Sequence, residues 1–145
     1  MAKKSKKNTK KPLLILGGFN DYGFLHYFPE NLGREVKLVL DIKEASAELK
    51  ANPDKYSAFL IEPSIYSQRE TEIHCLQGFM QHTRSNGGLA VVIFSNRDEI
   101  ALNQEFQLYH DQHYDAYVCK MEIDPGSNLA QRLSKTLDGL LTPKA

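Results

Sequence analysis

Five short apolar runs divide the sequence, and a segment with helical spacing follows each of them. The runs are Pro12–Leu16, Val36–Leu40, Ala58–Ile61, Leu89–Phe94 and the weaker Ala116–Cys119. The third and fourth runs are continuous rather than alternating, which is typical of strands covered on both faces. Strands that alternate with helices form a parallel sheet joined by right-handed crossovers. The sequence therefore predicts an α/β fold: a doubly wound, five-stranded parallel sheet in three α/β/α layers.

Cap signals and buried stripes outline the helices between these runs. Asp41 and Glu44 have the spacing of a capping box, and Ser67 and Glu70 repeat it. The pair Asp124–Pro125 is expected to open the last helix, because proline suits a first turn. The expected buried stripes are Ile42, Ala45 and Leu49; Ile73, Leu76 and Met80; Leu102, Phe106 and Tyr109; and Leu129, Leu133, Leu137 and Leu140.

The segment after the first run is the least regular. Asn20 or Asp21 is placed to cap a helix, and Pro29 is expected to kink or end that helix. Several aromatic residues either form an exposed patch here or face inward in alternation. They are Tyr22, Phe24, Tyr27 and Phe28.

Charge is unevenly distributed along the chain. Residues 1–11 contain six lysines and no acid, whereas residues 12–145 contain twelve basic and eighteen acidic residues, a net charge of −6. Residues 1–11 offer no apolar run to bury, so we expect a disordered basic tail. A single domain is expected over residues 12–141, with a C-terminal tail at 142–145. The basic tail is interpreted as a solubilising leader, with contact to nucleic acid or an anionic surface as the alternative. The acidic domain itself argues against nucleic-acid binding.

Neither membrane insertion nor a metal cluster is indicated. No apolar run approaches the about 20 residues that span a bilayer, and no apolar region follows the lysines as in a secretory signal. Cys75 and Cys119 are far apart and lack metal-like spacing. His110 and His113 lack a third convergent ligand and are expected in a solvated loop. These features predict a cytoplasmic protein.

Polar residues or glycines follow every expected strand. In chain order they are Gly17–Gly18, Asp41, Glu62, Ser95–Asn96 and Lys120. The carboxyl ends of parallel strands meet at one edge of a sheet, and ligands bind there at the topological switch point. The functional site is therefore expected among these residues.

The order of these residues resembles the receiver domain of two-component response regulators, the CheY-like superfamily. Receiver domains end strand one with acidic residues, strand three with the phosphorylated Asp, strand four with Ser or Thr, and strand five with Lys. Here Glu62 stands at the phosphoacceptor position, Ser95 and Lys120 match the next two, and Tyr117 matches the switch tyrosine. The resemblance covers residues 12–141 and implies a flavodoxin-like (βα)5 fold.

Two parts of the family site are replaced together. Gly17 and Gly18 stand where the acidic pair should be, so few oxygen ligands remain for Mg²⁺. Asp21 comes three residues late and is expected to cap a helix. Glu62 is one methylene longer than Asp, and a displacement of about 1 Å can cost about 100-fold in rate. These changes imply a pseudo-receiver with no bound metal or cofactor and no enzymatic activity. Lys120 is expected to pair with Glu62, which a purely structural ion pair would also explain.

The expected function is that of a phosphorelay-type signalling module acting by protein–protein contact. The resemblance implies that residues 99–141 form the partner face, for a sensor kinase, an output protein or a second copy. The alternative is a flavodoxin-like protein that binds a small ligand or nucleotide with Gly17, Gly18, Ser95 and Asn96. Direct contact between Glu62 and Lys120 favours the first function. Glycine amides pointing into an open cleft favour the second.

Overall fold

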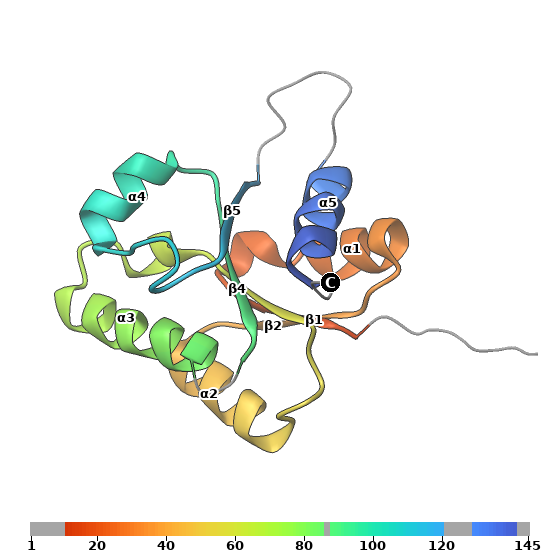
Figure 1. Cartoon of the computed structure of the whole chain (residues 1–145), viewed down its shortest axis with the longest axis horizontal. Helices are drawn as coiled ribbons and strands as arrows, with labels where there is room; N and C mark the ends of the chain where they lie inside the picture. The colour runs from red at the N-terminus through yellow and green to blue at the C-terminus, as the bar shows by residue number, and fades with distance from the viewer. Residues whose placement is uncertain (1–10, 86–87, 121–128, 142–145) are drawn as a thin grey trace, which may run out of the picture.

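The computed structural model of the chain describes residues 11–85, 88–120 and 129–141. Within these ranges, five parallel strands form one sheet in the order β2-β1-β3-β4-β5 (Figure 1). The strands are β1 (Leu13–Leu16), β2 (Val36–Val39), β3 (Ala58–Ile61), β4 (Ala90–Ser95) and β5 (Ala116–Cys119). This order places the topological switch between β1 and β3, so the site is expected where those two strands end.

Helices cover both faces of the sheet. They are α1 (Phe24–Leu32), α2 (Ile42–Ala51), α3 (Glu70–Ser85), α4 (Glu99–Phe106) and α5 (Leu129–Leu141), with 3-10 helices η2 (Phe19–Asp21) and η3 (Pro63–Tyr66). The side chains of α1 and α5 join one core cluster, whereas those of α2, α3 and α4 join the other (Figure 1). The predicted flavodoxin-like, three-layer α/β fold is confirmed.

The strands read as continuous apolar runs because both of their faces are buried. Leu14 and Leu16 of β1 belong to the cluster under α2, α3 and α4, whereas Leu13 and Ile15 belong to the cluster under α1 and α5. All four residues of β3 are likewise buried. Each such side chain contributes about 1.5–3 kcal/mol when removed from water, so the sheet anchors the domain.

The cap predicted for α2 is confirmed. The Glu44 amide donates to Asp41 Oδ1 at 2.7 Å, and Glu44 Oε1 accepts from the Leu40 amide at 2.9 Å. Ala45 is fully buried, and the other two residues of the predicted stripe pack against the same cluster. Local sequence chemistry therefore sets the start of this helix.

The cap predicted at Ser67 is wrong. The helix begins three residues later, at Glu70, because Gln68 has a left-handed φ of 63° that breaks helical geometry. The Ser67 hydroxyl donates instead to Glu105 Oε2 on α4, at 2.6 Å. A tertiary contact has thus replaced the local cap.

The end of α4 and the path of α1 also differ from expectation. Helix α4 ends at Phe106, because the next residue, Gln107, has a left-handed φ of 52°. Tyr109 therefore lies beyond the helix, and it is 52% exposed. Pro29 does not end α1, which runs on to Leu32. The Pro29 carbonyl accepts the amide of Gly33 at 3.1 Å and closes the last turn.

The segment between α4 and β5 is not a solvated loop throughout. His113 is only 5% exposed, and its Nδ1 accepts the Tyr109 amide at 3.0 Å. Burial, aided by Arg84, lowers the pKa of His113. His110 is exposed, as predicted. The part of the chain that the structure describes contains no group of three or more His, Cys, Asp or Glu side chains arranged to hold a metal ion.

Some predictions fall outside the described ranges. They are residues 1–10 of the basic tail predicted at 1–11, the start of the last helix at Asp124–Pro125, and the C-terminal tail at 142–145. The predicted stripe of α5 is described, and Leu129, Leu133 and Leu137 are buried. Among the helices described, none is both long and apolar enough to cross a membrane.

Candidate functional site

A cavity of about 460 Å³ opens at the carboxyl edge of the sheet. It is lined by residues that follow four different strands: Gly18, Asp21, Phe24, Glu62, Ser64, Ile65, Asn96 and Lys120. The structure thus brings Gly18, Glu62, Asn96 and Lys120 together, as predicted. Gly17, Ser95 and Tyr117 do not line the cavity.

Lys120 bridges two carboxylates inside this cavity. Its Nζ lies 2.7 Å from Asp21 Oδ1 and 2.9 Å from Glu62 Oε1, and all three side chains are at most 10% exposed. The ammonium also lies 5.4 Å from the centre of the Phe94 ring, within the range of a cation–π contact. The predicted Glu62–Lys120 pair is present. Because two carboxylates share one ammonium, a formal charge of −1 remains.

Both oxygens of Glu62 are engaged. Oε1 accepts from Lys120, and Oε2 accepts the Ser64 amide at 3.1 Å. The Glu62 amide donates to the Leu16 carbonyl at 2.9 Å, which ties the end of β3 to the end of β1. Glu62 therefore caps η3 and anchors the lysine at the same time.

Asp21 is a site residue that sequence reasoning assigned to another role. The residue that caps α1 is Gly23, and Asp21 belongs to η2. Its Oδ2 accepts the Gly18 amide at 2.9 Å, while its Oδ1 reaches Lys120. The carboxylate thus does both jobs: it closes a short turn and enters the site. The sequence signal for this contact is the spacing Gly18-x-x-Asp21. In a capping box, the side chain three residues after the cap residue accepts the amide of the cap residue in the same way.

Gly17 makes room for this carboxylate. A β-carbon at position 17 would lie 2.2 Å from Asp21 Oδ2, far inside contact distance. The Gly17 amide donates to the Val39 carbonyl at 3.1 Å, and the Gly18 amide is taken by Asp21. Neither amide is free for an anionic ligand in the cavity.

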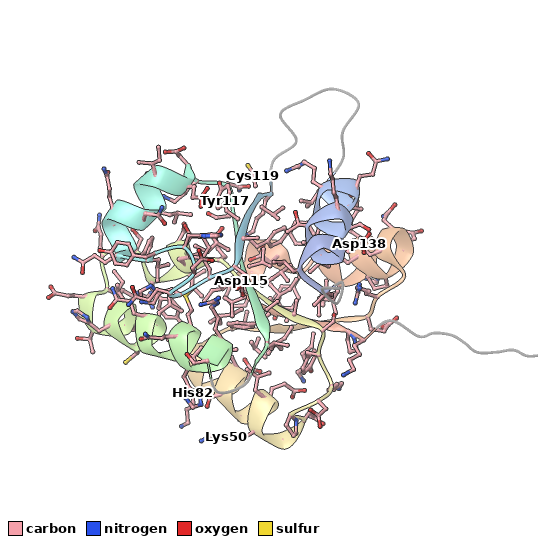
Figure 2. The ribbon with its side chains drawn as sticks, in the orientation of Figure 1. Lys50, His82, Asp115, Tyr117, Cys119 and Asp138 are labelled. Carbon is pink, nitrogen blue, oxygen red and sulfur yellow. The ribbon has the colours of Figure 1, made fainter. Side chains whose placement is uncertain are left out.

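Ser95 and Tyr117 both bond to the main chain of Arg97. Ser95 is fully buried, and its Oγ accepts the Arg97 amide at 3.1 Å. The Tyr117 hydroxyl donates to the Arg97 carbonyl. The ring packs against the core cluster that α2, α3 and α4 cover, and Tyr117 lies on β5 between Asp115 and Cys119 (Figure 2). Burial raises the pKa of Tyr117 to about 12.

Glu105 on α4 holds two of the site segments together. Its Oε2 accepts the Ser67 hydroxyl at 2.6 Å, and its Oε1 lies 2.5 Å from the Arg97 guanidinium. The hydroxyl of Ser67 and then the charge of Arg97 lower the pKa of Glu105. The segment after β3 is thereby tied to the segment after β4.

Comparison with solved structures places the fold among receiver domains. A two-component response regulator from Clostridium difficile aligns with a TM-score of 0.62 and 19% identity, over 91% of this chain and 96% of that one. The receiver domain of a sensor histidine kinase from Pseudomonas aeruginosa, with magnesium in its active-site cleft, gives 0.66 and 13%, over 93% and 100%. A response regulator receiver domain from Clostridium thermocellum gives 0.57 and 14%, over 91% and 94%.

Sequence comparison adds nothing to this likeness. No protein-family model matches the chain, and no curated protein matches it. With identities of 13–19%, the three alignments establish the receiver fold and leave the chemistry of the site to its own residues.

Proposed function

We propose that this chain is a receiver-like signalling module of the phosphorelay type that does not undergo conventional phosphorylation and acts through protein–protein contact. The observation that carries the proposal is the bridge from Lys120 to Asp21 and Glu62. The ammonium stands between the acceptor-position carboxylate and the remaining site acid. Lys120 thus offsets one of the two negative charges from within the chain. We further propose that the module has no enzymatic activity of its own.

Phosphoryl transfer to a carboxylate needs a free attacking oxygen and a cation that offsets the charge of the donor. Glu62 offers neither oxygen freely, because Lys120 and the Ser64 amide take them. A divalent cation bound by the same carboxylates would lie within a few ångströms of the ammonium and be repelled by it. The residues present thus do not fit a metal, and we propose that the module works without one.

The state of Tyr117 supports a module held in one conformation. Its ring is packed inward, with the hydroxyl bonded to the Arg97 carbonyl, although Lys120 rather than a phosphoryl group fills the site. The proposed output surface lies within residues 99–141, where Ile100 is 65% and Tyr109 is 52% exposed. A sensor kinase, an output protein or a second copy would bind there.

The alternative of a small-ligand or nucleotide binder is less well supported. It required glycine amides that point into an open cleft, but the Gly17 and Gly18 amides donate to Val39 and Asp21. It also required a serine in reach of the ligand, and Ser95 is fully buried.

Incubation with acetyl phosphate and Mg²⁺, and separately with beryllofluoride and Mg²⁺, tests the proposal. A phosphorylatable receiver domain in the same tube serves as the positive control. With acetyl phosphate, we expect the control protein to gain the mass of a phosphoryl group and this chain to gain none. With either reagent, the amide chemical shifts of Glu62, Ser95 and Tyr117 in this chain should stay unchanged. A phosphoryl adduct, or shift changes at those residues, would contradict the proposal.

The interaction surface is tested by affinity capture from native lysate. We expect a protein partner whose recovery falls with Ile100→Asp and is unchanged by Lys50→Asp, a charge change on α2. Recovery of a tightly held small molecule with no protein partner would favour the alternative.

A further inference from the structure

The segment between α4 and β5 is folded around a buried histidine. His113 is 5% exposed, and its main-chain amide donates to the Tyr109 carbonyl at 2.9 Å. In return, the Tyr109 amide donates to His113 Nδ1 at 3.0 Å, and the two rings lie with their centroids 5.8 Å apart. A main-chain amide can only donate, so Nδ1 carries no proton in this arrangement and the ring is neutral.

Protonation of His113 is incompatible with this arrangement. In the imidazolium form, both ring nitrogens carry a hydrogen and neither can accept. The hydrogen on Nδ1 would point at the hydrogen of the Tyr109 amide, and the new charge would be buried without a partner. The proton can therefore bind only when the contact between the ring and the Tyr109 amide is broken.

The charges around the ring also oppose the proton. Burial, and then the charge of Arg84 on α3, lowers the pKa of His113. The other titratable or charged side chains around the segment each have another partner. They are His110 and Asp111, which contact each other; Asp115, which binds Arg84; and Glu99 on α4, which accepts the Tyr114 hydroxyl.

Both ends of the segment are anchored without the histidine. Leu108 and Tyr114, on either side of residues 109–113, are fully buried. Asp115 is bonded to Val91 of β4 twice: its amide donates to the Val91 carbonyl at 2.7 Å, and its Oδ2 accepts the Val91 amide at 2.9 Å. Loss of the contact between His113 and Tyr109 would therefore open the middle of the segment and leave its ends in place.

We propose that residues 109–113 form an acid-sensitive switch, in which protonation of His113 breaks its bond to the Tyr109 amide and releases Tyr109. Tyr109 is 52% exposed and lies within the proposed output surface. Acid would thus change the shape of that surface. Only this last step rests on the proposed function, because the release itself depends on His113 and Tyr109 alone.

The direction of the switch follows from the linkage between proton binding and opening. The closed segment excludes the proton, whereas the open segment takes it up in the ordinary range of histidine. The stabilisation of the closed form is therefore complete above that range. Below it, the ratio of open to closed segments should rise by about tenfold per pH unit, the slope that one proton sets. The rise ends once the pH has fallen through the lowered pKa of His113 in the closed segment.

Amide hydrogen exchange of the full chain, followed by NMR between about pH 8 and about pH 5, tests the switch, because histidine changes charge in this range. The measured quantity is protection, the exchange rate of an unstructured peptide at the same pH divided by that of the chain. We expect the protection of the Tyr109 amide to fall by about tenfold per pH unit below the ordinary pKa of histidine. The Val91 amide should stay better protected by about tenfold or more at every pH, since it belongs to the sheet.

Two variants assign the pH dependence to one ring. In His113→Gln the side-chain oxygen can still accept the Tyr109 amide but takes up no proton, so the pH dependence of the Tyr109 protection should vanish. His110→Gln, at an exposed position in the same segment, should keep it. A measurement on the wild-type chain covers the case in which His113→Gln does not fold: the ring nitrogen shifts of His113 and the amide shift of Tyr109 should titrate with one midpoint.

Constant protection of Tyr109 while His113 titrates would overturn the switch. Equal protection of Tyr109 and Val91 at every pH would overturn it too, because the opening would then be global unfolding. The same holds for a pH dependence that His110→Gln abolishes and His113→Gln keeps. A chain that resists acetyl phosphate but keeps Tyr109 closed in acid refutes this inference alone, whereas phosphorylation refutes the proposed function and leaves the release of Tyr109 standing.

Discussion

The Asp21 carboxylate occupies the space that a side chain on Gly17 would need, with Oδ2 2.2 Å from the position of a β-carbon there. The acid at this edge of the sheet is thus supplied from η2 and not from the end of β1. The two residues depend on each other. A side chain at position 17 would collide with the Asp21 carboxylate, so Asp21 can hold this position only while residue 17 is glycine.

Gly17→Ala is expected to destabilise the fold by about 1–3 kcal/mol, the usual cost of forcing extra atoms into a packed site. The new methyl group must push Asp21 away from Lys120 and from the Gly18 amide. Urea unfolding followed by circular dichroism measures the effect. Gly23→Ala is the matched control, since no atom lies within 4 Å of a β-carbon there and its φ is −60°. The control should be neutral or stabilising by up to about 1 kcal/mol.

The pairing is tested further by the double variant Gly17→Ala with Asp21→Ala. Once the carboxylate is gone, the methyl group has space, so most of the cost of Gly17→Ala should disappear. Strictly additive losses in the two single variants and the double variant would rule out the steric relationship.

Lys120→Met should cost about 3–5 kcal/mol, because it leaves two buried carboxylates facing each other without a cation. Glu62→Gln should cost less, since Asp21 still neutralises the lysine. Lys37→Met removes a lysine whose side chain is 49% exposed and 3.9 Å from Glu48, and it should change stability by less than about 1 kcal/mol. Equal losses in the two lysine variants would mean that the bridge is not formed in solution.

Glu105→Gln should loosen the segments after β3 and β4 together. The substitution removes the charge that Ser67 and Arg97 both bind, and we expect a loss of about 1 kcal/mol, reduced by partial exposure of the pair. Amide hydrogen exchange should speed up around both segments. Glu70 lines a surface cleft together with Ser67, Arg97 and Glu105, and Glu70→Gln should leave exchange at Arg97 unchanged. Faster exchange at one segment alone would show that Glu105 does not join them.

The free energy of unfolding should fall as the pH drops below the ordinary pKa of histidine, because His113 is buried in the folded chain. Its pKa is lowered in the folded chain, so the unfolded chain binds the proton at higher pH. The stabilisation is complete above the unfolded pKa and is lost as the pH falls from there. Urea midpoints across that range measure the slope. His113→Gln should flatten it, whereas His26→Gln, at an exposed position on α1, should not.

The strand pattern predicted most of the fold, and strand ends predicted half of the site. Glu62 and Lys120 were expected to meet because parallel strands bring their carboxyl ends to one edge, whatever the loops do. Asp21 was assigned to a cap on α1 because its path depends on η2, a 3-10 turn with no periodic signal. The contact of Asp21 with Lys120 depends on the space beside Gly17, and that space is known only once the fold is known.

Local rules failed where distant residues competed with them. Ser67 has the sequence of a helix cap, but Glu105, 38 residues away, takes its hydroxyl. Tyr109 continues a helical spacing, but the chain turns at Gln107, a residue that gives no glycine-like signal. His113 sits in a polar stretch, yet it is buried because its ring accepts a main-chain amide.

The link between Ser95 and Tyr117 has a consequence for substitution experiments. Both bonds end on main-chain atoms of Arg97, its amide and its carbonyl. Exchanging the side chain at position 97 would report on its contact with Glu105 and leave the link itself in place. Proline is the exception among the natural amino acids, because it has no amide hydrogen to donate. A mutational scan would therefore rate this position as tolerant while the connection it carries remained undetected, and a backbone ester would expose that connection.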